Sequence, residues 1–278
     1  MTNSSVPVYV VALENSVRFR NLQSDLLMMN ISYTLIKAIN GRTLRKDQLR
    51  ELVNFDSCKS RLGVDISLPL IGCALSHRKA YQEFLNSNHE FAVILEEDVR
   101  LHRNFKNFIE SLTSELNFQS PTVVQLFTRG ERFVSRSEIA KLRNGKDSFE
   151  FSSIPGQAAA YLINRSAAQI ALSYLEVDGP SDWPNWASKV RFLGIFPFIA
   201  SETGEGSQIG PVPISNWQFR MRSLSILLGL HFVKYRNTFS SISDYRVIVY
   251  RPILKRVKWA LMGRPRFPAG DSSDLWIA

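Results

Sequence analysis

Apolar runs and amphipathic segments alternate along the N-terminal part of the chain. Residues 6–13 (VPVYVVAL) are rich in valine and tyrosine, which predicts a buried strand. Residues 18–29 place leucines and a methionine on one helical face, and residues 33–39 return to strand character before an Asn-Gly turn. This strand–helix–strand order is typical of a parallel sheet covered by helices.

The same alternation continues through the middle of the chain. Residues 91–95 (FAVIL) form a continuous apolar run, which is typical of a central strand covered on both faces. The other elements predicted are a helix over 71–86 that begins after Pro69, strands over 123–127 and 157–164, a helix over 166–175 capped by Ser166, and a loop, short helix and strand over 181–197. Together these elements predict an α/β domain.

Composition fits a globular protein with a full core. Of the 278 residues, 45% are hydrophobic and 21% are charged. Two cysteines, Cys58 and Cys73, are too few for a disulfide framework, which favours a reduced compartment and leaves a single bridge open. The chain starts with polar residues and has no apolar run of roughly 18 residues, so we predict neither a signal peptide nor a transmembrane helix.

Positive charge is concentrated at the C-terminal end. Residues 217–270 contain eleven basic residues and one acid, Asp244, so the formal net charge of this segment is +10. The whole chain carries +9, so the remaining residues together carry −1. Residues 217–236 place apolar side chains on opposed sides of a helical projection, and their apolar centre is too short to span a bilayer. The high pI therefore belongs to a C-terminal appendage.

Three carboxylates, Glu96, Glu97 and Asp98, follow the apolar run in FAVILEEDV. The carboxyl ends of strands are where open α/β sheets bind ligands, and Mg²⁺ or Mn²⁺ commonly binds through one or two carboxylates and substrate phosphates. Residues two apart on an extended chain point the same way, so Glu96 and Asp98 could share one ion. In a turn, Glu97 and Asp98 could do so instead, and a solvated acidic loop is the simpler alternative.

Five segments are informative when they are read in order: VVALENSVRFR, KAINGRTL, LIGCALSHRKAYQ, FAVILEEDV and GQAAAYLINRSAAQIAL. Together they resemble glycosyltransferase family 25, the bacterial lipopolysaccharide and lipooligosaccharide galactosyltransferases, with collagen galactosyltransferase domains as relatives. The resemblance covers roughly residues 8–210. Its most specific part is Gly-Cys-Ala-Leu-Ser-His followed by Leu-Glu-Glu-Asp.

The resemblance implies a GT-A-like, Rossmann-type nucleotide-sugar fold, a bound Mn²⁺ or Mg²⁺, and inversion at the anomeric carbon. It also implies UDP-galactose as donor and a lipooligosaccharide sugar as acceptor. The family pattern reads Leu-Glu-Asp-Asp, so Glu97 departs by one methylene and leaves open which two acids hold the ion. We assign the metal to Glu96 and Asp98 and the donor contacts to a second set: Asn15, Arg18, Ser76, His77, Glu97 and Gln157.

Each of these assignments has a simpler alternative. Arg18 could donate to a donor phosphate or be a solvated arginine, and His77 could contact the donor or pack in the core. An inverting transfer needs a general base. The first choice is Asp182, which is followed by Trp183 and lies near Trp186 in the sequence, and the second is Asp178. Asp182 could instead cap a short helix.

We therefore expect a catalytic domain over residues 1–216 and a basic, aromatic, helical appendage over 217–278. Each Lys or Arg near an anionic membrane contributes about 1 kcal/mol, so the appendage predicts peripheral binding at the cytoplasmic face of a bacterial inner membrane, towards a lipid-linked acceptor. Single-stranded nucleic acid is a less favoured partner, as is a plain solvated face. A saccharide- or nucleotide-binding module without turnover is the alternative function.

Overall fold

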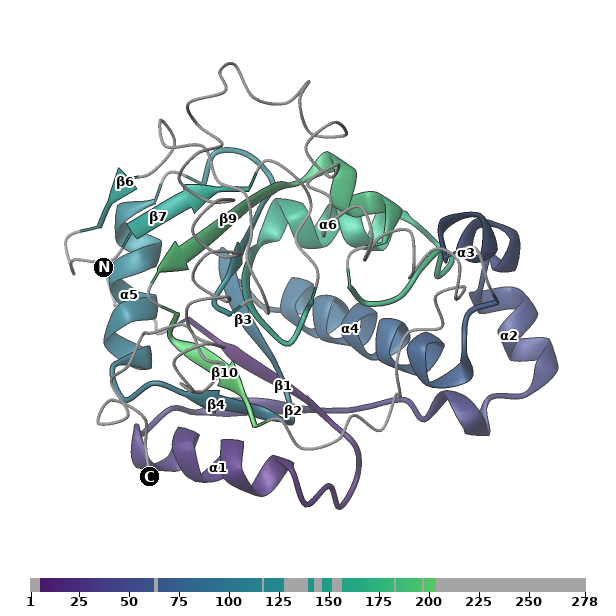
Figure 1. The fold of residues 1–278 in the computed structure, drawn as a ribbon, viewed down its shortest axis with the longest axis horizontal. Helices are drawn as coiled ribbons and strands as arrows, with labels where there is room; N and C mark the ends of the chain where they lie inside the picture. The colour runs from purple at the N-terminus through teal and green to yellow at the C-terminus, as the bar shows by residue number, and fades with distance from the viewer. Residues whose placement is uncertain are drawn as a thin grey trace, which may run out of the picture.

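The computed structural model describes residues 6–62, 65–116, 118–127, 140–142, 147–151, 157–182, 184–196 and 198–203. These residues form three layers, with a mixed sheet between two sets of helices (Figure 1). The C-terminal segment 217–278 lies outside the described residues. No helix in the described part of the chain is both long enough and apolar enough to cross a membrane.

The main sheet has, among the described residues, the strand order β2-β1-β3-β8-β5-β9-β7-β6. Its strands are β1 (Val8–Ala12), β2 (Tyr33–Lys37), β3 (Phe91–Glu96), β5 (Thr122–Gln125), β6 (Ala140–Lys141), β7 (Asp147–Glu150), β8 (Ala160–Asn164) and β9 (Arg191–Phe196). A second, two-stranded sheet pairs β4 (Val99–Leu101) with β10 (Ala200–Glu202) in antiparallel orientation.

Strand direction follows the prediction only in part. β1 is parallel to β2 and β3, which confirms the parallel unit predicted at the N-terminus. β8 lies between β3 and β5 and runs antiparallel to both, which the sequence did not predict. All five residues of β8 are buried, so the strand has no alternation of polar and apolar residues, and such a run reads the same in either direction.

Helices cover both faces of the main sheet (Figure 1). They are α1 (Phe19–Met28), α2 (Lys46–Leu52), α3 (Phe55–Leu62), α4 (Leu68–Asn86), α5 (Phe105–Glu115) and α6 (Arg165–Ser173), with short 3-10 helices η1 (Gly41–Thr43) and η3 (Asn185–Lys189). α4 includes Pro69 in its first turn, where proline is tolerated, so this helix begins slightly before the predicted start.

Alternate strand residues supply two separate cores, because successive side chains of a strand point to opposite faces. Val8 and Val10 of β1 pack with α1 and α5 on one face. Tyr9 and Val11 pack with α4, α6 and η3 on the other. α2 and α3 form a smaller cluster with the N-terminal half of α4. The carboxyl ends of β1 and β3 therefore meet between α1 and α4.

Two arginines join α4 and α6. Arg78 of α4 donates to carbonyls at the end of α6, including Leu175 O at 3.1 Å. Arg165, at the start of α6, donates to the carbonyl of Leu85 in the last turn of α4 and to that of His89 after the helix, both at 3.1 Å. Each guanidinium satisfies carbonyls that have no partner within their own helix.

The cap of α6 differs from the prediction. Asn164 Oδ1 accepts hydrogen bonds from the amides of Ala167 (3.1 Å) and Thr122 (2.9 Å), so Asn164 is the N-cap residue. The assignment of the cap to Ser166 was wrong, because the last residue of β8 already supplies the acceptor.

Candidate active site

A cleft of about 670 Å³, including its open mouth, lies at the carboxyl ends of β1 and β3. Its walls come from the end of β1, the loop from β2 into η1, one face of α4 and the acidic end of β3. Five of the predicted site residues line it: Arg18, Ser76, Glu96, Glu97 and Asp98.

Arg18 and the end of β1 fix Glu97. Oε2 of Glu97 accepts a hydrogen bond from the amide of Leu13 at 2.9 Å, and Oε1 of Glu97 pairs with Nη2 of Arg18. Arg18 also pairs through Nη1 with Oδ2 of Asp98 at 3.0 Å. Glu97 is buried, so both of its oxygens are committed to the protein and Arg18 orients two of the three acids.

Asp98 keeps one oxygen available. Its Oδ1 is buried and has no hydrogen-bond partner among the described residues. Burial, followed by the neighbouring charge of Glu96, raises the pKa of Asp98 above its ordinary value, against the lowering effect of Arg18. A buried acceptor without a donor is costly, and a cation at this oxygen would remove that cost.

Glu96 ends a buried chain of hydrogen bonds. Nε2 of His77 lies 3.0 Å from Oε1 of Glu96, and Nδ1 of His77 lies 2.8 Å from the hydroxyl of Tyr161. The Tyr161 hydroxyl lies 2.8 Å from that of Tyr81. If each hydroxyl donates towards the histidine, His77 donates from Nε2 to the carboxylate. His77 and the two tyrosines are all buried, so this chain fixes the orientation of Glu96.

Cys73 is the other neighbour of Glu96. Its Sγ lies 3.7 Å from Oε1 of Glu96 and 3.1 Å from the hydroxyl of Ser181. Burial, and then the charge of Glu96, raise the pKa of the Cys73 thiol well above its ordinary value. Burial raises the pKa of Glu96, but the hydrogen bond and charge of His77 outweigh it, and the net shift is downward. Glu96 is therefore an ionised carboxylate beside a neutral thiol.

The segment Gly-Cys-Ala-Leu-Ser-His packs α4 closely against the loop between β2 and η1. Ser76 Oγ accepts from the amide of Ile39 at 2.8 Å and donates to the carbonyl of Gly72 at 2.6 Å. A Cβ on Gly72 would lie 2.4 Å from the carbonyl oxygen of Ile39 and 2.5 Å from the amide nitrogen of Gly41. The segment thus brings α4 against the β2–η1 loop, and that contact forms one wall of the cleft.

Gly72→Ala is expected to destabilise the fold by about 1–3 kcal/mol, because the added methyl overlaps backbone atoms that cannot rotate away. The gain in helix propensity of about 1 kcal/mol is smaller. Urea unfolding would measure the change, with Gln82→Ala on the exposed side of the same helix as control. Equal stability of both variants would contradict the close-contact explanation.

The remaining predicted residues lie outside the lining of the cleft. Asn15 is exposed in the β1–α1 loop with a positive φ of 62°. Gln157, also with a positive φ, donates from Nε2 to Glu202 Oε1 at 3.1 Å. Asp182 is exposed, and it is close enough to Cys73 for its charge to contribute to raising the thiol's pKa.

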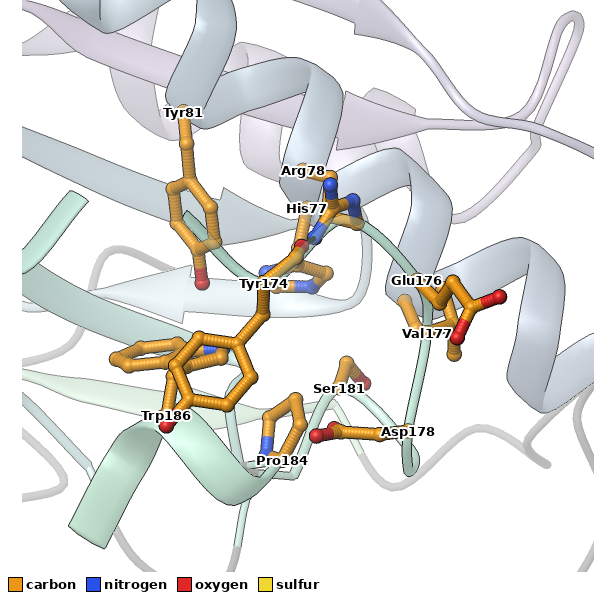
Figure 2. Close-up of a pocket in the computed structure, with 11 residues that line it drawn as sticks. His77, Arg78, Tyr81, Tyr174, Glu176, Val177, Asp178, Ser181, Pro184 and Trp186 are labelled. Carbon is orange, nitrogen blue, oxygen red and sulfur yellow. Dashed lines mark hydrogen bonds between the residues drawn. The ribbon is translucent and has the colours of Figure 1, made fainter. Parts of the chain in front are cut away.

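A second pocket, of about 330 Å³ including space open to solvent, is lined in part by His77. Figure 2 shows aromatic side chains on one side of it and carboxylates on the other: Tyr81, Tyr174 and Trp186, and Glu176 and Asp178. Oδ1 of Asp178 accepts from the amide of Asn185, the first residue of η3, at 3.2 Å. Asp178 therefore supplies a side-chain acceptor at the start of η3.

Sequence reasoning missed three residues of this region. Cys73 and Tyr161 contact the Glu96–His77 pair, and Arg42 lines the cleft at an exposed position without an ion pair in the described part of the chain. The spacing of Cys73 and His77, four apart on a helix, was a usable signal, because such residues share a face. Tyr161 gave no such signal, since its strand is buried throughout.

The described lining of the cleft contains two arginines, Arg18 and Arg42, and three carboxylates. Its formal charge is therefore negative, which disfavours a diphosphate on its own. A divalent ion at Glu96 and Asp98 would reverse this balance, and the unpartnered Oδ1 of Asp98 fits such an ion.

The chain matches the model of a known protein family. The model of glycosyltransferase family 25 (LPS biosynthesis protein) matches residues 5–182. The probable inactive glycosyltransferase 25 family member 3 of Rattus norvegicus is 29% identical over 115 residues, which are 39% of this chain and 20% of that protein. The inactive member 3 of Mus musculus is 29% identical over 118 residues, 40% of this chain and 20% of that protein. The chain thus spans about a fifth of the length of these relatives.

Similar solved structures are more distant. One is a glycosyltransferase involved in the glycosylation of the major capsid of PBCV-1, with 10% identity, coverage of 60% of this chain and 64% of that chain, and a TM-score of 0.30. Another is the inositol-1-phosphate CTP transferase from T. maritima, with 11% identity, coverage of 79% and 96%, and a TM-score of 0.36.

Proposed function

The chain belongs to glycosyltransferase family 25, and from this premise we propose that it is an active, metal-dependent transferase. It moves a hexose, with galactose as first choice, from a UDP-linked donor onto a saccharide acceptor. The observation that carries the proposal is the acidic end of β3, where Glu96 and Asp98 line a cleft and one oxygen of Asp98 is buried without a partner among the described residues.

Glu96 and Asp98 are the residues that would hold Mn²⁺ or Mg²⁺. When bound, such an ion neutralises the diphosphate leaving group and polarises the bond to the departing sugar. Glu97 is less suited to this role, because Leu13 and Arg18 already occupy both of its oxygens. These contacts of Glu97 support the choice of Glu96 and Asp98 among the three acids.

The protein's own residues orient the reacting groups. His77 holds Glu96 in one position through Nε2, and Tyr161 holds His77. Arg18 holds Asp98, and Arg42, exposed at the cleft, is placed to meet the donor phosphates. Ser76 supports the cleft wall, and Asn15 and Gln157 are proposed donor contacts from the loops around it.

Asp182 is the proposed general base. It is exposed, lies near the Cys73 side of the acidic cluster and follows Ser181, whose hydroxyl contacts Cys73. In an inverting transfer the base takes the proton of the acceptor hydroxyl while that oxygen attacks the anomeric carbon opposite the leaving diphosphate. The transition state has oxocarbenium character.

The acceptor is proposed to be lipid-linked, in keeping with the family's description as LPS biosynthesis proteins. The segment 217–270 carries +10, which would attract the chain to an anionic membrane. Residues 1–216 would then be the catalytic domain and 217–278 the membrane-associating appendage.

A binding module without turnover is the second candidate, because the curated relatives reported above are described as inactive or probably inactive. Such a protein would keep the cleft and bind UDP-sugar or saccharide. It would have no need for a carboxylate oxygen that is buried without a partner, and the geometry of Asp98 favours the transferase.

Release of UDP distinguishes the two candidates. The full-length protein is incubated with UDP-galactose or UDP-glucose and Mn²⁺, with and without EDTA, and free UDP is measured. We expect release that requires the metal and is faster with one of the two donors. Measurable UDP binding with no release from either donor would support the binding module, and release unaffected by EDTA would contradict the metal-dependent mechanism.

A further inference from the structure

We propose that Cys73, His77 and Glu96 form a binding site for Zn²⁺, and that zinc at this site inhibits the transferase by withdrawing Glu96 from the catalytic metal. The first half rests on geometry alone. The second half rests on the proposed function.

The three potential ligand atoms are close together. Cys73 Sγ, a ring nitrogen of His77 and a carboxylate oxygen of Glu96 all lie within 4.8 Å of one another. His77 Nε2 is 3.0 Å and Cys73 Sγ is 3.7 Å from Oε1 of Glu96. Tetrahedral zinc with bonds of about 2.0–2.3 Å holds its ligands about 3–4 Å apart, so small side-chain adjustments are sufficient.

Two rigid elements carry these ligands. Cys73 and His77 are four residues apart in α4 and therefore share one face of the helix. Glu96 is the last residue of β3, which lies in the interior of the sheet between β1 and β8. Zinc would need no rearrangement of the backbone.

Outer partners of the kind found around zinc sites are also present. Metal-bound histidines usually hydrogen-bond through their other ring nitrogen, and Nδ1 of His77 is 2.8 Å from the Tyr161 hydroxyl. The Ser181 hydroxyl lies 3.1 Å from Cys73 Sγ. These contacts orient the thiol and the imidazole before any ion binds.

Access is from the catalytic cleft. Cys73 and Glu96 both line it, and the Glu96 side chain is 23% exposed, whereas that of His77 is only 2% exposed. Three protein ligands with one open side leave a fourth position for water, as in zinc sites that exchange their ligands.

Binding requires a defined proton balance. The Cys73 thiol loses its proton to solvent, so that the thiolate binds the ion. In the zinc-bound state the single ring proton of neutral His77 moves from Nε2 to Nδ1 and is donated to the Tyr161 hydroxyl, which turns its own proton towards Tyr81, so that Nε2 presents its lone pair. Thiolate and imidazole select Zn²⁺ over Mn²⁺ and Mg²⁺, which prefer oxygen ligands. Glu96 cannot then serve the oxygen-ligated ion that the transferase needs.

The test uses Co²⁺ as a spectroscopic probe of the full-length, metal-free protein, with Zn²⁺ as competitor. We expect a thiolate-to-cobalt charge-transfer band, displaced by one equivalent of Zn²⁺. Cys73→Ser should lose the band and bind Zn²⁺ at least about 10-fold more weakly. Cys58→Ser is the matched control, because the Cys58 thiol is buried in α3 against the carbonyl of Val177. It should keep both properties.

Zinc inhibition is measured separately, relative to each variant's own zinc-free rate of UDP release. Cys73→Ser should require about 10-fold more Zn²⁺ for half-inhibition. A band that survives in Cys73→Ser, or equal zinc affinity in both cysteine variants, would overturn the site. Weaker zinc binding with unchanged inhibition would overturn the inhibitory role. If the protein releases no UDP at all, the proposed function fails and the inhibitory role with it, while the cobalt band still decides the site.

Discussion

Asp98→Asn is expected to lower the rate of metal-dependent UDP release about 100-fold or more. The substitution keeps the size of the side chain but replaces one carboxylate oxygen with an amide group and removes the negative charge, so the buried oxygen that has no partner in the described residues no longer belongs to a carboxylate. It also weakens the pair with Arg18. The rate of release and the apparent affinity for Mn²⁺ should fall together, which steady-state kinetics over a Mn²⁺ series would measure.

Asp182→Asn is the matched comparison, because Asp182 is an exposed aspartate outside the described lining of the cleft. It should keep the affinity for Mn²⁺ and UDP and lose transfer to the acceptor, since a general base contributes about 10²–10⁴-fold. Unchanged Mn²⁺ affinity in Asp98→Asn would remove Asp98 from the metal site. Full transfer activity in Asp182→Asn would remove Asp182 as the base.

Arg100→Met is expected to destabilise the fold by about 3–5 kcal/mol. Arg100 donates from Nε (2.8 Å) and Nη2 (3.0 Å) to the carboxylate of Asp25, which also accepts from the amide of Leu101 at 2.9 Å. The Asp25 side chain is fully buried, whereas that of Arg100 is 28% exposed. Removing the arginine therefore leaves a carboxylate that cannot reach water, in the contact that joins α1 to β4.

Urea unfolding would measure this loss, with Arg191→Met as control. The pair of Arg191 with Glu150 also contains a short contact of 2.6 Å, but its side chains are 40% and 34% exposed, so its loss should cost less than about 1 kcal/mol. The double variant Asp25→Leu with Arg100→Met should recover most of the stability, because it leaves no buried charge. Equal effects of Arg100→Met and Arg191→Met would show that burial does not determine the strength of the pair.

The sequence determined most of the elements that build the site, for physical reasons that act locally. Apolar periodicity over 6–39 predicted β1, α1 and β2 and their parallel pairing, since side-chain spacing and a short connection constrain both. The run FAVIL placed Glu96, Glu97 and Asp98 at the carboxyl end of a central strand, which the structure confirms. The family was also recognisable, because its motifs are contiguous in the chain.

Only the tertiary structure decided how these acids differ. Glu97 bonds to Leu13, which is 84 residues away, and Glu96 faces Cys73 and His77 from α4. Such partners meet because β3 lies beside β1 and under α4. A local sequence pattern cannot predict contacts between residues so far apart in the chain. The antiparallel direction of β8, which brings Tyr161 to His77, was equally hidden, because a strand buried on both faces carries no sign of its direction. Local spacing thus determined which carboxylates lie at the end of the strand, and long-range packing determined that Asp98 keeps a buried oxygen without a hydrogen-bond partner among the described residues.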